Sequence, residues 1–239
     1  PKSNKILYFI STVDNYNVHE NITLDVNTNL HVLCEVLDYC RSKDIEFNFI
    51  SSWFVYGKTS LPAKENSLCD PTGFYSITKK CAEDLLISFC NTYGVKYRIL
   101  RLCNVLGLGD RKASRKKNAI MWMINQLKLD NDINLYDNGS PYRDVMHIKD
   151  VCRAIKLVID SGELNTIYNI GSGYPTQVGE IINFVKDYIN SKSKINTIEP
   201  PEFHKNVQAQ DFWMDIEKIQ SLGFVPEFTL EEGLKNICQ

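Results

Sequence analysis

Tyrosine and lysine side chains four residues apart are the first candidates for chemistry in this sequence. Three such pairs occur: Tyr39/Lys43, Tyr75/Lys79 and Tyr188/Lys192. On a helix, residues at this spacing lie on the same face. A free tyrosine has a pKa of about 10, and a nearby ammonium favours its phenolate, so such a pair can remove a proton from an alcohol. The spacing alone does not choose among the three pairs.

The apolar pattern predicts an α/β fold in which short buried strands alternate with helices. Strands are expected at 5–11, 46–52, 97–102 and 166–171, because these runs are short, apolar and bounded by polar residues or glycine. Helices are expected at 26–43, 75–93 and 149–160, the last with Asp150 as its N-cap. This alternation is typical of a parallel sheet covered by helices on both sides.

The later part of the chain predicts a smaller lobe. Further elements are expected as helices at 118–129 and 178–190, short strands at 133–136 and 193–199, and an irregular loop at 199–214. We therefore predict a Rossmann-like cofactor-binding part formed by residues 1–109 and 144–175. Residues 110–143 and 176–239 are expected to form a partly interleaved α/β substrate lobe.

The position of each Tyr/Lys pair relative to the sheet selects the middle one. Ligands of open parallel sheets bind beyond the carboxyl ends of the strands. Ser52 ends the strand at 46–52, and Tyr75 opens the next helix after a loop of 22 residues. We therefore expect Ser52, Tyr75 and Lys79 to face one crevice, whereas the other two pairs lie at the far ends of their helices.

These three residues, in this order, resemble the catalytic triad of the extended short-chain dehydrogenase/reductases, the branch that acts on nucleotide sugars. Six motifs follow in register over almost the whole chain: SSWFVYG at 51–57, YSITK at 75–79, LRLCNVLGLG at 100–109, NGSPYRDVMHIKD at 138–150, YNIGSG at 168–173 and DIEKIQSLGFVP at 215–226. The resemblance implies that Tyr75 takes a proton from a sugar hydroxyl while a hydride leaves the same carbon for NAD. It also implies that Ser52 hydrogen-bonds the reacting oxygen and that Lys79 holds the cofactor ribose.

The same resemblance assigns binding residues. For the cofactor NAD, with NADP not excluded, it implies Ile10, Ser11, Asn29, Tyr75, Lys79 and Cys103. For a nucleoside-diphosphate sugar it implies Ser52, Asn104, Asn118, Tyr136, Arg143, Lys205 and Gln208. Lys205 and Gln208 depart from the family pattern, which has an arginine and an acidic residue at these positions.

One segment of the family pattern is not found in this sequence. Family members begin with a strand, a GxxGxxG turn and a helix whose backbone amides bind the cofactor pyrophosphate. Roughly 60 to 70 residues of that pattern are absent, so we expect a fragment of a longer enzyme. The alternative is a degenerate binding module without catalysis. The stretch GSGYPT at 171–176 is not expected to replace the turn, because Thr176 stands at the third glycine and Pro175 interrupts it.

The two residues after Ser52 bear on the type of reaction. The 4,6-dehydratases of the family carry an Asp-Glu pair there, whereas this chain has Trp53 and Phe54. Without that pair no acid and base are available at this place to eliminate water. We therefore predict an epimerase that works through a keto sugar, with a keto-reductase or dehydratase as the alternatives. Whether Trp53 and Phe54 are pocket walls or core residues stays open.

Composition limits the compartment and the partners. A net charge of −2, 44% hydrophobic residues and the lack of an 18-residue apolar run predict a cytoplasmic protein without a membrane segment. The eight cysteines never form CxxC, which favours reduced thiols and no metal site. The basic cluster at 111–117 is too short to predict nucleic-acid binding and favours a loop or an anion site. The resemblance adds a homodimer through the helices at 26–43 and 75–93.

Overall fold

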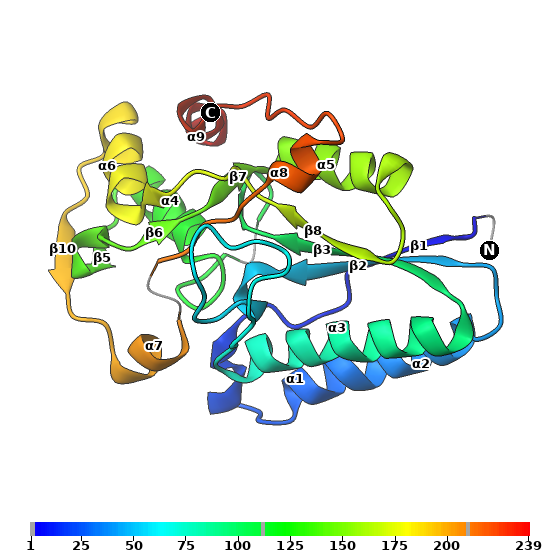
Figure 1. The fold of residues 1–239 in the computed structure, drawn as a ribbon. Helices are drawn as coiled ribbons and strands as arrows, with labels where there is room; N and C mark the ends of the chain where they lie inside the picture. The colour runs from blue at the N-terminus through cyan, green and yellow to red at the C-terminus, as the bar shows by residue number, and fades with distance from the viewer. Residues whose placement is uncertain (1–2, 111–112, 209–210) are drawn as a thin grey trace.

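A four-stranded parallel sheet lies at the centre of the computed structural model, which describes residues 3–110, 113–208 and 211–239 (Figure 1). Its strands are β1 (Lys5–Tyr8), β2 (Glu46–Ser52), β3 (Lys96–Leu102) and β8 (Thr166–Ile170), in the order β1-β2-β3-β8. Phe49 of β2 is in register with Tyr8 on one side and with Ile99 on the other. The α/β fold class and the existence of the four predicted strands are therefore confirmed, although β1 ends at Tyr8 and not at the predicted residue 11.

Helices cover both faces of this sheet, as Figure 1 shows. One face carries α1 (Leu24–Val26), a π-helical turn η2 (Asn27–His31), α2 (Val32–Cys40) and α3 (Phe74–Tyr93). The other face carries α5 (Ile148–Ser161) and α8 (Glu217–Gln220). On α3 the buried side chains recur at helical spacing at Ala82, Leu86 and Cys90. They pack against strand residues such as Phe47, and Gly94 ends the helix in the left-handed conformation at φ 70°.

A second group of elements packs beside the carboxyl ends of these strands. It contains α4 (Ala119–Lys128), β5 (Ile133–Tyr136), α6 (Val178–Tyr188), β10 (Ile195–Ile198) and α9 (Leu230–Cys238). Strands β5 and β10 pair in parallel, and the helices bury residues such as Ile124, Leu127 and Ile181 in a common core. The boundaries between the two predicted units stay a prediction.

Short elements connect the two groups. The strand pairs are β4 (Asn104–Leu106) with β7 (Val145–His147) and β6 (Tyr142–Arg143) with β9 (Thr176–Gln177). Single turns of 3₁₀ helix are η1 (Asn15–His19), η3 (Trp53–Val55) and η4 (Asp137–Gly139), and α7 (Glu202–Val207) is a short helix. Within the described ranges, no helix has the length and apolar character needed to cross a membrane.

Two local predictions are wrong. Asp150 is not the N-cap of α5, which is His147; it lies in the first turn, where its carboxylate accepts from the backbone amides of Glu227 and Phe228 at 3.0 Å. The segment 199–214 is not wholly irregular, because it contains α7. Helix α9 is an element that the sequence reading missed, although Thr229 and Glu232 form a capping box at its start.

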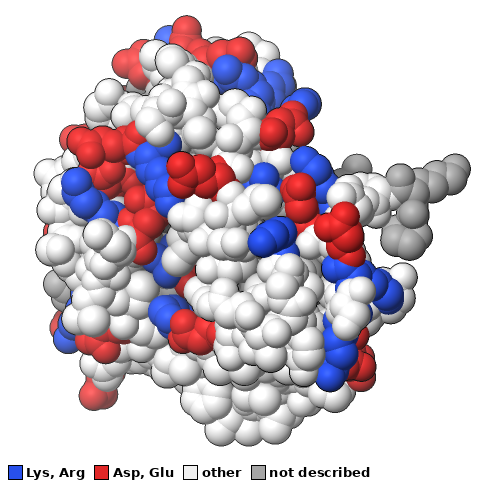
Figure 2. All heavy atoms as spheres, turned by 45° about the vertical axis from the view of Figure 1, so that its right-hand side comes forward, with Lys and Arg blue, Asp and Glu red and all other residues white. Residues whose placement is uncertain are grey.

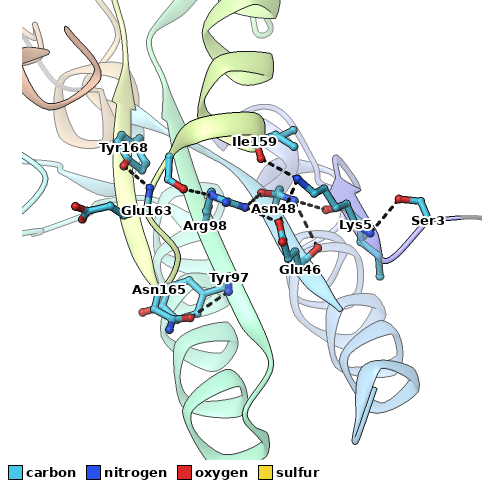
Figure 3. A network of polar contacts seen from close by, with 12 residues as sticks. Ser3, Lys5, Glu46, Asn48, Tyr97, Arg98, Ile159, Glu163, Asn165 and Tyr168 are labelled. Carbon is cyan, nitrogen blue, oxygen red and sulfur yellow. Dashed lines mark hydrogen bonds and ion pairs between the residues drawn. The ribbon is translucent and has the colours of Figure 1, made fainter. Parts of the chain in front are cut away.

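A polar network joins the amino-terminal ends of the strands (Figure 3). The guanidinium of Arg98, a residue that is 5% exposed, donates to the Gly162 carbonyl at 3.0 Å, the Glu46 carboxylate at 2.9 Å and Asn48 Oδ1 at 3.2 Å. Asn48 in turn donates to the carbonyl of Ile6 on β1 at 3.1 Å. The network therefore ties β1, β2 and β3 to the end of α5 and leaves the opposite edge of the sheet for other contacts.

The surface carries charges of both signs. On the face in Figure 2, basic and acidic side chains of the described residues lie side by side among uncharged ones. The described part of this face therefore presents no broad area of one sign.

We expect the substitution Arg98→Met to destabilise the fold by about 2 to 3 kcal/mol, because it removes donors from a buried carbonyl and a buried amide. Urea unfolding monitored by circular dichroism measures the change. Lys5→Met is the matched control, since Lys5 pairs with the same carboxylate from an exposed position and should cost less than about 1 kcal/mol. Equal losses in the two variants would contradict the role of Arg98.

Candidate active site

Ser52 and Tyr75 meet at the carboxyl edge of the sheet. Ser52 is the last residue of β2, and Tyr75 is the second residue of α3. A hydrogen bond with the Ser52 side chain lowers the pKa of the Tyr75 phenol, but burial has the larger effect and raises that pKa to about 12. The structure thus brings together the serine and the tyrosine that the sequence selected.

The start of α3 is fixed by a contact with η1. Gly73, the N-cap of α3, has φ 85°, and a Cβ at this position would lie 2.5 Å from Oδ1 of Asn15. The same oxygen accepts hydrogen bonds from the backbone amide and the hydroxyl of Ser76 at 3.2 Å. A glycine is needed here for both reasons, and this packing sets the position of Tyr75.

Lys79 is buried one turn further along α3, and only 2% of the residue is exposed. Its Nζ donates to the carbonyl oxygen of Ile50 at 2.7 Å and lies 4.2 Å from the centroid of the Phe49 ring. Burial lowers the pKa of Lys79 to about 7, although the Glu83 carboxylate acts in the opposite direction. Burial therefore weakens the preference of this side chain for its charged form near neutral pH.

The expected acidification of Tyr75 by the Lys79 ammonium is not found in this structure. The pKa of Tyr75 is raised, first by burial and then by the negative charges of Asp25 and Asp14. Burial disfavours the phenolate, and it equally disfavours the ammonium that was expected to stabilise the phenolate. The four-residue spacing of Tyr75 and Lys79 predicts that the two side chains lie on the same face of a helix, but it does not predict their protonation states.

Asn29 connects the segment after β1 to α3. Its Oδ1 accepts from Ser11 Oγ at 3.0 Å and from the Thr12 amide at 2.8 Å, and its Nδ2 donates to Thr78 Oγ1 at 2.9 Å. Asn29 is 2% exposed and lies in the π-helical turn η2, a conformation that is frequent at functional sites. Of the other predicted cofactor contacts, Ile10 after β1 is 48% exposed and Cys103 after β3 is buried.

A cavity of about 220 Å³ lies next to these residues. Five of the predicted substrate residues line it: Asn104, Asn118, Tyr136, Arg143 and Gln208. Phe54 also lines the cavity, and its ring meets that of Tyr75 edge to face at 5.8 Å, which links the cavity to the Ser52/Tyr75 pair. Lys205 is not among the lining residues, and its ammonium pairs with the Glu199 carboxylate at the surface.

The cavity wall carries mostly positive charge. The Arg143 guanidinium lies 5.6 Å over the ring of Trp53, and burial lowers its pKa to about 10, which leaves it charged at neutral pH. Arg115 and Lys116, from the basic cluster of the sequence, line the same cavity, with the Lys116 ammonium paired to the Glu20 carboxylate at 2.9 Å. Asp14 is the acidic residue among its described lining residues. This balance favours an anionic ligand.

Trp53 belongs both to the core and to the cavity wall. It is 4% exposed, and its ring stacks on Phe54 at 4.0 Å and on Phe212 at 4.8 Å, while one side borders the cavity. Trp53 is therefore both a core residue and part of the cavity wall, the two alternatives that the sequence left open.

Tyr16 and His204 are cavity residues that the sequence reading missed. The Tyr16 hydroxyl and His204 Nδ1 share a hydrogen bond of 2.9 Å, and the His204 ring lies 4.7 Å from that of Tyr136. The two residues are 188 positions apart in the chain. Since neither belongs to a motif, the sequence contains no signal that could pair them.

The glycine-rich stretch at 171–176 binds a carboxylate of the chain itself. Asp144 accepts hydrogen bonds from the amide and hydroxyl of Ser172 at 2.7 Å and from the amide of Gly173 at 3.2 Å. A Cβ at Gly171 would lie 2.6 Å from the same carboxylate. The amides that a phosphate loop would need are therefore already used for tertiary structure.

Comparison with known proteins shows a match to one family. The model of the NAD dependent epimerase/dehydratase family matches residues 4–171. The chain is 28% identical over 236 residues to a putative UDP-glucose 4-epimerase of Methanocaldococcus jannaschii, covering 97% of this chain and 75% of that protein. It is 29% identical to the low-salt glycan biosynthesis protein Agl12 of Haloferax volcanii, covering 88% of this chain but 66% of that protein.

Solved structures share the fold. A UDP-glucose 4-epimerase of Thermotoga maritima with UDP-glucose superposes with a TM-score of 0.89 at 23% identity, over 99% of this chain and 76% of that chain. A UDP-glucose 4-epimerase of Thermus thermophilus in complex with NAD gives a TM-score of 0.87 at 20% identity, over 99% of this chain and 77% of that chain. At these identities the likeness establishes the arrangement of elements.

The buried ammonium predicts a pH-dependent stability. Between pH 7 and 10.5 the unfolded lysine holds a proton that the folded one loses, so this group makes the free energy of unfolding rise with pH. Lys79→Met removes that dependence. We expect the stability of the variant relative to the unsubstituted chain to fall by about 2 to 3 kcal/mol between pH 6 and pH 9.

Urea unfolding at pH 6, 7, 8 and 9 measures this difference. Lys80→Met is the control, because Lys80 pairs with Asp84 on the outer face of α3, and its effect should not vary with pH in this range. A pH-independent difference between Lys79→Met and the unsubstituted chain would show that Lys79 keeps an ordinary pKa.

Proposed function

The chain belongs to the NAD-dependent epimerase/dehydratase family, and we propose that it catalyses the epimerisation of a nucleoside-diphosphate sugar through a keto-sugar intermediate. The observation that carries this proposal is the meeting of Ser52 and Tyr75, beside buried Lys79, at the border of a cavity with positive walls. The similarity to a putative UDP-glucose 4-epimerase supports it.

Tyr75 and Ser52 are the proposed proton-handling groups. With a pKa of about 12, the Tyr75 phenol is neutral at pH 7 and can donate a hydrogen bond to the carbonyl oxygen of a keto sugar. To take the proton of a sugar hydroxyl it needs a positive charge nearby, which Lys79 supplies in its protonated form. Ser52 would hydrogen-bond the same sugar oxygen and keep it in line with the phenol.

Lys79 also fits the ribose hydroxyls of NAD. An ammonium has three N–H donors, and within the described residues the Lys79 Nζ donates to one acceptor, the Ile50 carbonyl. Ser11, Asn29 and Cys103 lie at the same edge, and Ile10 offers an exposed apolar side chain for the nicotinamide side. When bound, NAD supplies an acceptor that takes a hydride from the sugar carbon and returns it.

Arg143 is the proposed anchor of the substrate diphosphate. Its planar, charged guanidinium suits two phosphate oxygens, and Arg115 adds charge on the same wall. Asn104, Asn118, Tyr136 and Gln208 would then contact the nucleoside and the sugar. Lys205 is left out of this set, because its ammonium is paired with Glu199 outside the cavity.

The aromatic pair after Ser52 favours epimerisation over dehydration. Trp53 and Phe54 stack at 4.0 Å and are packed against Phe212 and Tyr75, so they fill the place where an acid and a base would be needed to remove water. A keto-sugar reductase would use the same Ser52, Tyr75 and Lys79. Unlike an epimerase, it would consume reduced cofactor in each turnover.

A homodimer in the cytoplasm is part of the proposal. Helix α3 presents an apolar stripe at four-residue spacing, formed by Ile77 (50% exposed), Cys81 and Leu85 (38% exposed), on the side away from the sheet. Two copies could bury these stripes together with the neighbouring α1 and α2. All eight cysteines are free thiols in the structure, which fits a reducing compartment.

We expect Tyr75→Phe to lower turnover at least about a hundredfold, because it removes the proposed proton-transfer group while keeping the ring. The assay uses the full-length product of the coding sequence with NAD and UDP-, CDP-, GDP- and dTDP-sugars, and it follows sugar interconversion by NMR. Tyr39→Phe is the matched control from the surface pair Tyr39/Lys43 and should keep full activity.

Three results are informative in this assay. Interconversion without net formation of NADH supports an epimerase, whereas net NADH formation with release of a keto sugar would point to the reductase running in the oxidising direction. Equal activity of Tyr75→Phe and the unsubstituted enzyme would reject the proposed chemistry.

The dimer is tested by Leu85→Glu, which places a charge in the proposed α3 stripe. We expect the molar mass in size-exclusion chromatography with light scattering to fall from that of two chains to that of one, since burying an unpaired carboxylate is costly. Leu129→Glu, at a position 67% exposed and far from α3 in the sequence, is the control and should stay dimeric. An unsubstituted chain that is already monomeric at micromolar concentration would disprove the proposal.

A further inference from the structure

A buried ion pair lies one helical turn beyond Lys79. Arg101 of β3 binds Glu83 of α3 through two hydrogen bonds, Nε to Oε1 at 3.1 Å and Nη2 to Oε2 at 2.7 Å. The side chains are 2% and 1% exposed. Burying two charges costs desolvation energy that their attraction often only offsets, and apolar replacements of such pairs are often neutral for stability. The pair is therefore weak evidence for a purely stabilising role.

The surroundings of Arg101 tie it to the elements that carry the candidate site. In the sheet it is in register with Ser51, the residue before Ser52. Its guanidinium lies 4.6 Å over the ring of Tyr56, and Nη1 donates to the Glu65 carbonyl at 3.2 Å in the loop between β2 and α3.

The loop residues that contact Arg101 are themselves hydrogen-bonded to a residue of β8. The Tyr56 hydroxyl donates to Asn169 Oδ1 at 2.6 Å, and the backbone amide of Asn169 donates to the Glu65 carboxylate at 3.0 Å. Arg101 and its charge are thus fixed by partners on three sides, so the guanidinium cannot move away from Glu83 without breaking these contacts.

Glu83 and Lys79 share one face of α3. Residues four apart on a helix have their Cβ atoms about 5 to 6 Å apart, and both side chains are buried. In such surroundings charges interact more strongly than in water. Strand β2 contributes to Lys79 only uncharged groups, the Phe49 ring and the Ile50 carbonyl, within the part of the chain that the structure describes.

We propose that Glu83 and Arg101 are positioning residues for Lys79, Glu83 by favouring its ammonium over the neutral amine and Arg101 by fixing the Glu83 carboxylate and limiting its negative charge. This inference rests on the proposed function, in which Lys79 serves Tyr75 and the cofactor. In agreement with it, the Glu83 charge raises the pKa of Lys79 against the effect of burial. Two further acidic groups, Asp25 and Asp14, raise the pKa of Tyr75.

A purely structural pair would hold α3 against β3 without changing the proton affinity of Lys79. The two roles differ in the sign of single substitutions. Glu83→Gln leaves the positive Arg101 uncompensated, so Lys79 should bind its proton more weakly. Arg101→Gln leaves the negative Glu83 uncompensated, so Lys79 should bind its proton more tightly.

The proton affinity of Lys79 is measured by NMR on the chain labelled with [ε-¹³C]lysine, titrated from pH 5 to 10 without sugar or cofactor. The Lys79 signal is assigned by its loss in Lys79→Met. We expect changes in proton affinity on the order of tenfold, downward for Glu83→Gln and upward for Arg101→Gln. Asp84→Asn, on the outer face of α3, is the control and should leave the titration unchanged.

A double variant keeps the test decisive if a single substitution prevents folding. Glu83→Met/Arg101→Met replaces both charged groups by unbranched apolar side chains, and the proton affinity of Lys79 should fall, but less than in Glu83→Gln. Unchanged titration in the double variant, or shifts of the same sign in both single variants, would overturn the inference. Because the titration needs no turnover, it can fail or succeed independently of the proposed enzymatic function.

Discussion

A lysine ammonium enclosed by the protein is the constraint on which the rest of this site depends. Lys79 has one hydrogen-bond acceptor, the Ile50 carbonyl, and one aromatic face, Phe49, among the described residues. Such an environment disfavours the charged form and brings the pKa of Lys79 to about 7. Burial likewise raises the pKa of Tyr75 to about 12, so it disfavours the charged form of both groups.

The amino-terminal and carboxyl-terminal ends of the parallel strands form two edges of the sheet, and their polar contacts differ. At the amino-terminal edge, Arg98 and Asn48 connect neighbouring strands by hydrogen bonds that are satisfied within the chain. At the carboxyl edge, the contact of Gly73 with Asn15 places the start of α3, and Asn29 holds the segment after β1. The polar groups of the first edge are hydrogen-bonded to one another, whereas Lys79 at the second edge donates to a single acceptor among the described residues.

The cavity draws its wall from parts of the chain that are far apart in sequence. Arg143 and Asn118 come from the region between β4 and β7, and Tyr16 comes from the segment after β1. The Tyr16–His204 hydrogen bond joins two parts of the wall that are 188 positions apart in the chain. The ring of Phe54, which lines this cavity, meets that of Tyr75 and so joins the cavity to the Ser52/Tyr75 pair.

The sequence by itself determined the α/β alternation and the place of Ser52, Tyr75 and Lys79 at one sheet edge, because helical and strand periods and short spacings are local properties. It could not give the raised pKa of Tyr75 or the lowered pKa of Lys79, since both follow from burial by residues that come from other elements. The tertiary structure also decided that Asp150 binds the backbone of Glu227, which is distant in sequence, and is not the N-cap of α5. Burial and long-range hydrogen bonds arise only when the chain is folded, and they set the chemistry of side chains whose types and spacing the sequence already provides.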